Sequence, residues 1–108
     1  MKILKFLLIS FFVSITISVN TFADEVKMKK GLEIFNETAG CAACHVLKAA
    51  GSEGNIGPNL DTVSMTIESV TDMVTNGLGV MPAFGEGEIF TKEEIDIVSY
   101  YVVNAAGK

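Results

Sequence analysis

Apolar residues recur at helical spacing in three stretches of the chain, and no stretch shows the period-two alternation that predicts a strand. The pattern predicts helices over roughly residues 25–36 and 66–76, and a third helix that begins at Thr91. Glu94 follows Thr91 at the spacing of a capping box, and Gly77 stands where a glycine commonly ends a helix. The sequence therefore predicts an all-α fold.

Two loops separate these helices, roughly over residues 46–65 and 77–90, and both contain several glycines without being of low complexity. Long loops inside a small domain usually carry function or enclose something. We therefore expect them to wrap around a core that they do not supply themselves.

The N-terminal segment has the composition of an export signal. Two lysines form a basic start, residues 3–19 are almost wholly apolar, and small residues precede a cleavage point after Ala23. We predict a signal peptide over residues 1–23, a single domain over residues 24–108, and a location in the periplasm or an equivalent extracytoplasmic compartment. The alternative is an uncleaved membrane anchor, although the apolar run is shorter than the roughly 20 residues that a spanning helix needs.

Charge and size narrow the possible functions. Without the two lysines of the predicted signal, six basic side chains remain against thirteen acidic ones, which gives a formal charge of −7. An acidic domain is a poor match for nucleic acid or for an anionic membrane surface, so we expect neither as a partner. A domain this short also has a marginal hydrophobic core, and commonly needs a disulfide, a metal or a buried cofactor.

Cys41, Cys44 and His45 form the strongest chemical signal, in the run Cys-Ala-Ala-Cys-His. Two thiols at this spacing can add to the two vinyl groups on one edge of a haem, and the histidine that follows then lies under the iron. The motif comes after an export signal, and haem of the c type is attached after export. It predicts one haem c, bound by thioether links to Cys41 and Cys44 and ligated by His45.

Three other uses of the cysteine pair stay open at this stage. A thioredoxin-like redox pair needs a strand before the motif, and none is predicted there. A structural zinc site wants four ligands, whereas the chain has two cysteines and one histidine. A structural disulfide that closes so short a loop gains little stability and strains easily.

The sixth position of the iron is assigned by elimination, because His45 is the only histidine. Met28 and Met73 fall within predicted helices at core-like spacings, where methionine usually packs. Met81 stands in a glycine-bearing loop beside a proline that fixes the backbone, and its rival is Met65 at the edge of the second helix. We predict Met81 as the axial ligand.

A ligating histidine normally donates its other ring N–H to an acceptor, which fixes its tautomer and orientation. Pro58 stands in a stiff turn downstream of the cysteine motif and offers a backbone carbonyl for this purpose. The alternative is that Pro58 only shapes its loop.

These motifs resemble those of class I cytochrome c, particularly the short bacterial and algal forms, and the resemblance covers essentially the whole mature chain. The fragments that carry it stand in the family's order along the chain: Gly31 with Phe35, Cys41 to His45, Gly57 to Leu60, Met81 to Phe84, and Ile97 with Tyr100. The resemblance implies three to four helices packed around one covalently bound haem. It also implies that the first and third helices cross where Gly31 permits close approach beside Phe35 and Tyr100.

The resemblance further implies one-electron transfer, Fe(III) to Fe(II), without enzymatic catalysis. An iron ligated by His45 and Met81 has no open position for a substrate, and no other histidine is left to act as a base. We predict a monomeric carrier whose redox protein partners have basic docking surfaces. The alternatives are a haem c subunit of a larger dehydrogenase or oxidase complex, and an enzyme or ligand sensor with an open haem position.

Overall fold

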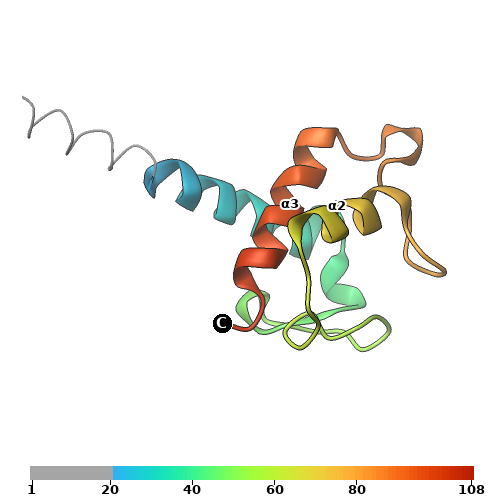
Figure 1. Cartoon of the computed structure of the whole chain (residues 1–108), viewed down its shortest axis with the longest axis horizontal. Coiled ribbons are helices and arrows are strands. Elements are labelled where there is room, and N and C mark those ends of the chain that lie inside the picture. The colour runs from blue at the N-terminus through green and yellow to red at the C-terminus, as the bar shows by residue number, and fades with distance from the viewer. Residues whose placement is uncertain (1–20) are drawn as a thin grey trace, which may run out of the picture.

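A computed structural model describes residues 21–108, so all but the last three residues of the predicted signal peptide lie outside the described part. Figure 1 shows helix α3 (Lys92–Ala105) packed with helix α2 (Ile67–Asn76), and the helix of residues 21–33 running into them from one side. Within residues 21–108, no helix is long and apolar enough to cross a membrane. The predicted all-helical class is confirmed.

Short elements connect the three helices. They are a π-helical turn η1 (Ile34–Thr38), 3₁₀ turns η2 (Cys41–Ala43), η3 (Lys48–Ala50) and η4 (Glu86–Glu88), and strands β1 (Val46–Leu47) and β2 (Ser52–Glu53). The first helical segment therefore runs slightly past residue 36, because η1 continues it. The two strands pair antiparallel, with Val46 opposite Glu53. The sequence did not predict this hairpin, because two residues per strand are too few to show an alternation.

Both later helices begin at threonine caps. The Thr91 hydroxyl accepts a hydrogen bond from the Glu94 N–H (3.2 Å), and Glu94 Oε2 accepts one from the Thr91 N–H (2.8 Å). Thr66 and Ser69 make the equivalent reciprocal pair at the start of α2. These side chains satisfy backbone donors that a helix leaves unpaired at its first turn. The capping box predicted at Thr91 is confirmed.

The core forms where the three helices meet the loop after the cysteine motif. It consists of Ile34, Phe35, Leu47, Val70, Val74, Ile95, Val98, Tyr101, Val102 and Ala105. Met28 packs against this core as expected, but Met73 is 38% exposed, so the expectation that it packs inside is wrong. Its neighbour Val74 takes the inward position instead.

The crossing of the first helix with α3 uses Tyr101 rather than Tyr100. A Cβ atom on Gly31 would strike the Tyr101 side chain, and the rings of Phe35 and Tyr101 lie 6.0 Å apart. Tyr100 instead lies under Lys27, whose Nζ is 4.2 Å from the ring centroid. Successive helical residues point about 100° apart, so a register error of one residue moves a side chain out of the buried face.

Candidate cofactor site

The cysteine motif forms one tight turn. Cys41 begins η2, and its carbonyl accepts hydrogen bonds from the backbone N–H of Cys44 (3.1 Å) and of His45 (3.0 Å). Gly40, directly before the turn, adopts a left-handed conformation with φ +70°. Five consecutive residues on this turn therefore supply both thiols and the imidazole.

The imidazole of His45 is oriented by a hydrogen bond. Nδ1 lies 2.8 Å from the carbonyl oxygen of Pro58. A carbonyl can only accept, so Nδ1 carries the proton and Nε2 keeps its lone pair. This is the tautomer that a metal-ligating histidine requires. The structure thus brings Pro58 to the ring of His45, thirteen residues away in the chain.

Gly57 stands in one of the motifs that carry the resemblance, but its contact with the His45 ring was not predicted from the sequence. A Cβ atom at this position would lie 2.5 Å from His45 Cε1 and 2.8 Å from Nδ1, so the ring rests directly against the glycine backbone. The Gly57 N–H also donates to the Cys44 carbonyl (2.7 Å), and the Leu60 N–H donates to the Val46 carbonyl (3.0 Å). Only the glycine preceding a proline hinted at this close approach.

Asp61 fastens the same loop to two other parts of the chain. Its Oδ2 accepts a hydrogen bond from the Lys48 N–H and its Oδ1 accepts one from the Gly107 N–H, each at 2.9 Å. The hydrogen bonds from Gly107 and Lys48 lower the pKa of the Asp61 carboxyl from its ordinary value. No sequence pattern pointed to this residue, because its partners are backbone groups distant in the chain.

The state of the cysteines does not favour the other uses considered for them. Both are free thiols. Burial raises the pKa of Cys41 to about 11, with a smaller contribution from Cys44, whereas redox-active cysteines have lowered pKa values. In the part of the chain that the structure describes, no group of three or more His, Cys, Asp or Glu side chains is placed to hold a metal ion.

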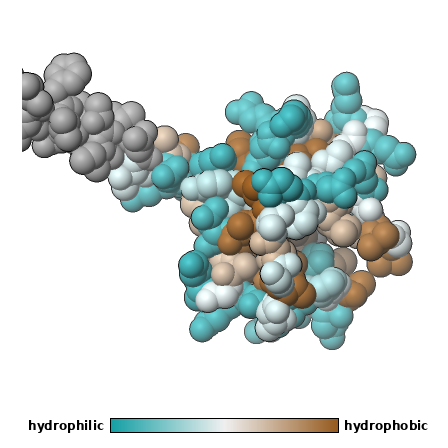
Figure 2. Space-filling view, in the orientation of Figure 1, coloured by the Kyte–Doolittle hydropathy of each residue, from teal (hydrophilic) through white to brown (hydrophobic). Residues whose placement is uncertain are grey.

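Met81 stands on a separate loop that closes on α2. Its N–H donates to the Leu78 carbonyl (3.0 Å) and its carbonyl accepts from the Leu78 N–H (3.2 Å), which makes a tight turn. Met81 is partly buried and packs against the core, and so does Met65. Leu78 and Val80 at the tip are 71% and 87% exposed, and Figure 2 shows apolar surface at the edge of the molecule away from the first helix.

The residues present fit a haem c. His45 offers a free Nε2, the cysteines offer two thiols on one turn, and Met81 offers a partly buried thioether on another loop. The apolar face of a porphyrin also matches partly buried side chains that pack against the core. Among them are Cys41, Ala42, Leu60, Met65, Met81 and Phe84.

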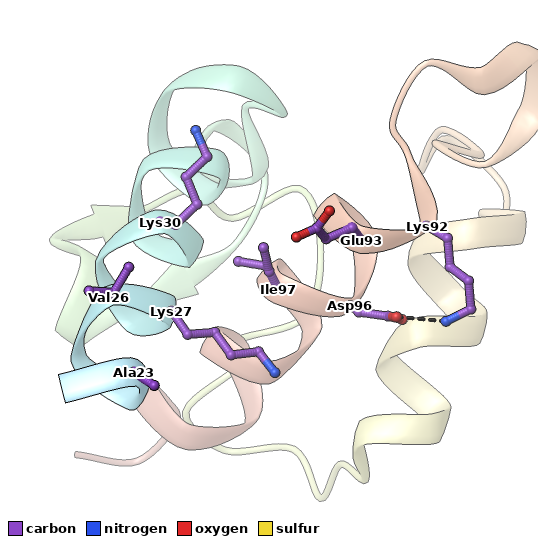
Figure 3. Close-up of a pocket in the computed structure, with 8 residues that line it drawn as sticks. All are labelled: Ala23, Val26, Lys27, Lys30, Lys92, Glu93, Asp96 and Ile97. Carbon is purple, nitrogen blue, oxygen red and sulfur yellow. Dashed lines mark hydrogen bonds and ion pairs between the residues drawn. The ribbon is translucent and has the colours of Figure 1, made fainter. Parts of the chain in front are cut away.

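A shallow groove lies elsewhere, between the first helix and the start of α3 (Figure 3). Three lysines line it, and each already has a partner. Lys92 pairs with Asp96 (2.6 Å), Lys30 pairs with Glu33 outside the groove (2.9 Å), and Lys27 covers an aromatic ring. The groove therefore has no cluster of unpaired cations that would favour an anionic ligand.

Comparison with known proteins agrees with the site. Residues 26–102 match the family described as cytochrome c oxidase, cbb3-type, subunit III. Cytochrome c6 of Leptolyngbya boryana is 36% identical over 84 residues, which cover 72% of this chain and 92% of that protein. Cytochrome c6 of Pyropia yezoensis is 35% identical, with coverage of 95% and 91%.

A solved structure extends the comparison to the fold. The crystal structure of the c-type cytochrome SorU from Sinorhizobium meliloti superposes with a TM-score of 0.70 and 48% identity, over 78% of this chain and 95% of that one. Proteins of the cytochrome c family carry one covalently bound haem c, and the cytochrome c6 relatives transfer electrons without catalysing a reaction. The chain therefore belongs to the class I monohaem cytochromes c.

Proposed function

We propose that this monohaem electron carrier holds its haem c through thioether links from Cys41 and Cys44. His45 Nε2 and the Met81 sulfur are the axial ligands of the iron. The observation that carries this proposal is the 2.8 Å hydrogen bond from His45 Nδ1 to the Pro58 carbonyl, which fixes the tautomer that leaves Nε2 free.

With His45 and Met81 as ligands, both axial positions of the iron are occupied. This supports an electron carrier over an enzyme or a ligand sensor. The bound haem supplies the one-electron chemistry, Fe(III) to Fe(II), and a methionine ligand favours a relatively high potential. The chain's own residues hold the cofactor, orient the imidazole and exclude water. No proton transfer is required of them.

Absorption spectroscopy of the purified holoprotein tests this assignment. We expect a low-spin c-type spectrum, a weak long-wavelength sulfur-to-iron band in the ferric form, and a single one-electron wave in potentiometry. Rapid uptake of carbon monoxide by the reduced protein would show an open iron and would favour the sensor or enzyme instead.

The proposal includes export. Residues 1–23 act as a cleaved signal, and residues 24–108 form the mature domain in the periplasm. The basic start, the apolar run and the small residues Thr21 and Ala23 before the cleavage point support this. Mass spectrometry of the haem protein from a periplasmic fraction should give a chain beginning at Asp24. A full-length chain recovered with membranes would mean that the segment is kept as an anchor.

The redox partners have basic docking surfaces. Residues 65–96, which include the Met81 loop, carry seven acidic side chains and one basic one. Complementary charge raises the association rate, and salt screens it over a Debye length of about 8 Å at physiological ionic strength. The second-order rate with the physiological partner should therefore fall as salt rises.

The alternative to docking by charge is docking through the apolar tip of the Met81 loop, formed by Leu78 and Val80. Electron-transfer interfaces are small, often below ~1,200 Å². Stopped-flow kinetics over a salt series separates the two. A flat rate would favour the apolar tip, and a rate that climbs with salt would mean that the partner is acidic.

A second candidate is a haem c subunit of a larger complex. The match to a family named for subunit III of an oxidase favours it. Size-exclusion chromatography of a native extract, followed by haem absorbance, decides between the two. A carrier elutes as a monomer, whereas a subunit co-elutes with larger proteins at a fixed ratio.

A further inference from the structure

The loop that bears Met81 is fastened by its backbone to the last turn of α2. The Gly77 N–H donates to the Met73 carbonyl (2.8 Å), the Phe84 N–H to the Val74 carbonyl (3.0 Å), and the Gly85 N–H to a carbonyl of the same turn. These bonds satisfy carbonyls that a helix leaves free at its C-terminus. Both ends of the loop are therefore held by the same helix, α2.

Gly77 lies where the start of this loop comes into contact with the returning segment, residues 81–83. Its φ is +66° and its ψ is 177°, a conformation that essentially only glycine adopts. A Cβ atom here would lie 2.5 Å from the Met81 carbonyl oxygen, 2.8 Å from the Pro82 carbonyl carbon and 2.8 Å from the Ala83 nitrogen. All three are backbone atoms, so they cannot move aside as the end of a flexible side chain can.

We propose that Gly77 is a positioning residue that sets the place of the Met81 backbone, and through it keeps the methionine sulfur at the iron. The inference rests on the proposed role of Met81 as axial ligand. A side chain at residue 77 displaces the segment from Met81 to Ala83 away from α2, and the sulfur at its start moves with it. The iron then spends more time without its sixth ligand.

Gly79 provides a matched control within the same loop. Its φ is +58°, close to that of Gly77, but a Cβ atom there would have no neighbour within 4 Å. An alanine at residue 79 therefore adds the backbone strain of a left-handed conformation without touching Met81. Gly79→Ala therefore shows what a side chain at positive φ does in this loop without the contact with the Met81 backbone.

Gly77→Ala, Gly79→Ala and Met81→Ala are compared as purified holoproteins, by the ferric sulfur-to-iron band and by carbon monoxide binding to the ferrous form. We expect Gly77→Ala to weaken the band and to raise the carbon monoxide association rate about tenfold, because the open fraction sets the apparent rate. Gly79→Ala should stay close to the wild type. Unchanged far-UV circular dichroism in both variants would exclude global unfolding as the cause.

Each result has one meaning. If Met81→Ala keeps the band, the proposed ligand is wrong. If Met81→Ala loses the band and Gly77→Ala keeps it, only the role of Gly77 is wrong. Equal changes in Gly77→Ala and Gly79→Ala would assign the effect to backbone strain and would also overturn the inference.

Hydrogen exchange of the wild-type holoprotein covers the case in which Gly77→Ala yields no haem protein. The inference requires the amides of Met81 and Phe84 to be protected together with those of α2, and the amide of Val80 at the exposed tip to exchange faster. Exchange of Met81 at the rate of Val80 would mean that the loop is not held closed, and would overturn the inference.

Discussion

The two sides of the candidate site are built differently. On one side, His45 is held by a hydrogen bond on its own ring and by the backbone of Gly57 against its face. On the proposed methionine side, the sulfur of Met81 is a weak acceptor without a comparable hydrogen bond. Its side chain packs against the core, its backbone forms a turn with Leu78, and the end of its loop bonds to α2. The histidine is oriented directly, whereas the methionine is oriented through its loop.

The thiols and the imidazole lie on one short turn, but the ring of His45 is oriented by Gly57 and Pro58, and Asp61 ties that loop to Gly107 near the end of the chain. The methionine side depends on how residues 77–85 sit on α2. We therefore expect variants on the two sides to fail in different ways, and the following changes test this from the largest effect to the smallest.

Removing the covalent anchor should have the largest effect. Replacing Cys41 and Cys44 with alanine prevents thioether attachment, and a domain of this size has a marginal core without its cofactor. We expect the double variant to lose cooperative thermal unfolding, measured by far-UV circular dichroism. Ala43→Ser, within the same motif, serves as a control that keeps both thiols. A double variant that stays helical and melts cooperatively without haem would disprove the role of the cofactor in the core.

Removing the methionine should leave the fold but change the iron. Met81→Ala should keep its haem, lose the sulfur-to-iron band and lower the midpoint potential by on the order of 0.1 V, since axial ligands set haem potentials over a wide range. Met65→Ala is the matched control, because Met65 also packs against the core. If Met65→Ala shows these changes and Met81→Ala does not, the ligand is the other sulfur.

Crowding the imidazole should disturb the histidine side without opening the iron. Gly57→Ala adds a Cβ atom 2.5 Å from His45 Cε1, and overpacking of this kind lowers the melting temperature by about 10 °C in a small domain. The haem spectrum should shift while carbon monoxide binding stays slow. Asn55→Ala, an exposed change in the same loop, should match the wild type. An unchanged melting temperature in Gly57→Ala would mean that the ring is not held against this backbone.

The smallest effect is expected at Asp61, which ties the histidine side to the C-terminus. A carboxyl whose pKa is lowered in the folded state adds stability above its unfolded pKa of about 3.9, and this is lost as pH falls through the folded value. Asp61→Asn should melt a few degrees lower at pH 7, and this difference from the wild type should shrink below pH ~4. Glu53→Gln on β2 controls for the loss of one negative charge. A difference in melting temperature between Asp61→Asn and the wild type that stays constant down to pH ~2 would contradict the proposed dependence of stability on the Asp61 carboxylate.

Most of the fold could be predicted from the sequence, because its signals are local. The cap at Thr91 and the apolar stripe of α3 each lie within a few residues. The errors arose where a choice depended on facing elements. Tyr101 rather than Tyr100 meets Gly31, and Met73 faces outward, since a single helical register decides each case.

The same distinction applies to the candidate site. The cysteine motif and its histidine are contiguous, so the sequence identifies them directly. The partnership of His45 with Pro58 could be expected from the chemistry of ligating histidines, but the bonds of Asp61 to Lys48 and Gly107 could not, because backbone donors carry no sequence signature. Gly77 was interpreted only as a helix stop, and its contact with the Met81 backbone became visible only once the loop was folded.

The closure of the Met81 loop on a single helix makes the exposed tip of this loop a site for protein engineering. Both ends of the loop and its hydrogen bonds to α2 belong to residues 67–85, and the Phe90 N–H adds a bond to the Phe84 carbonyl from outside this stretch. Redesign of the exposed tip at Leu78 and Val80 should therefore leave the rest of the fold intact, and a library confined to the tip can vary partner choice at constant architecture. The loop after the cysteine motif offers no such freedom, since Asp61 binds it to Gly107 at the far end of the chain.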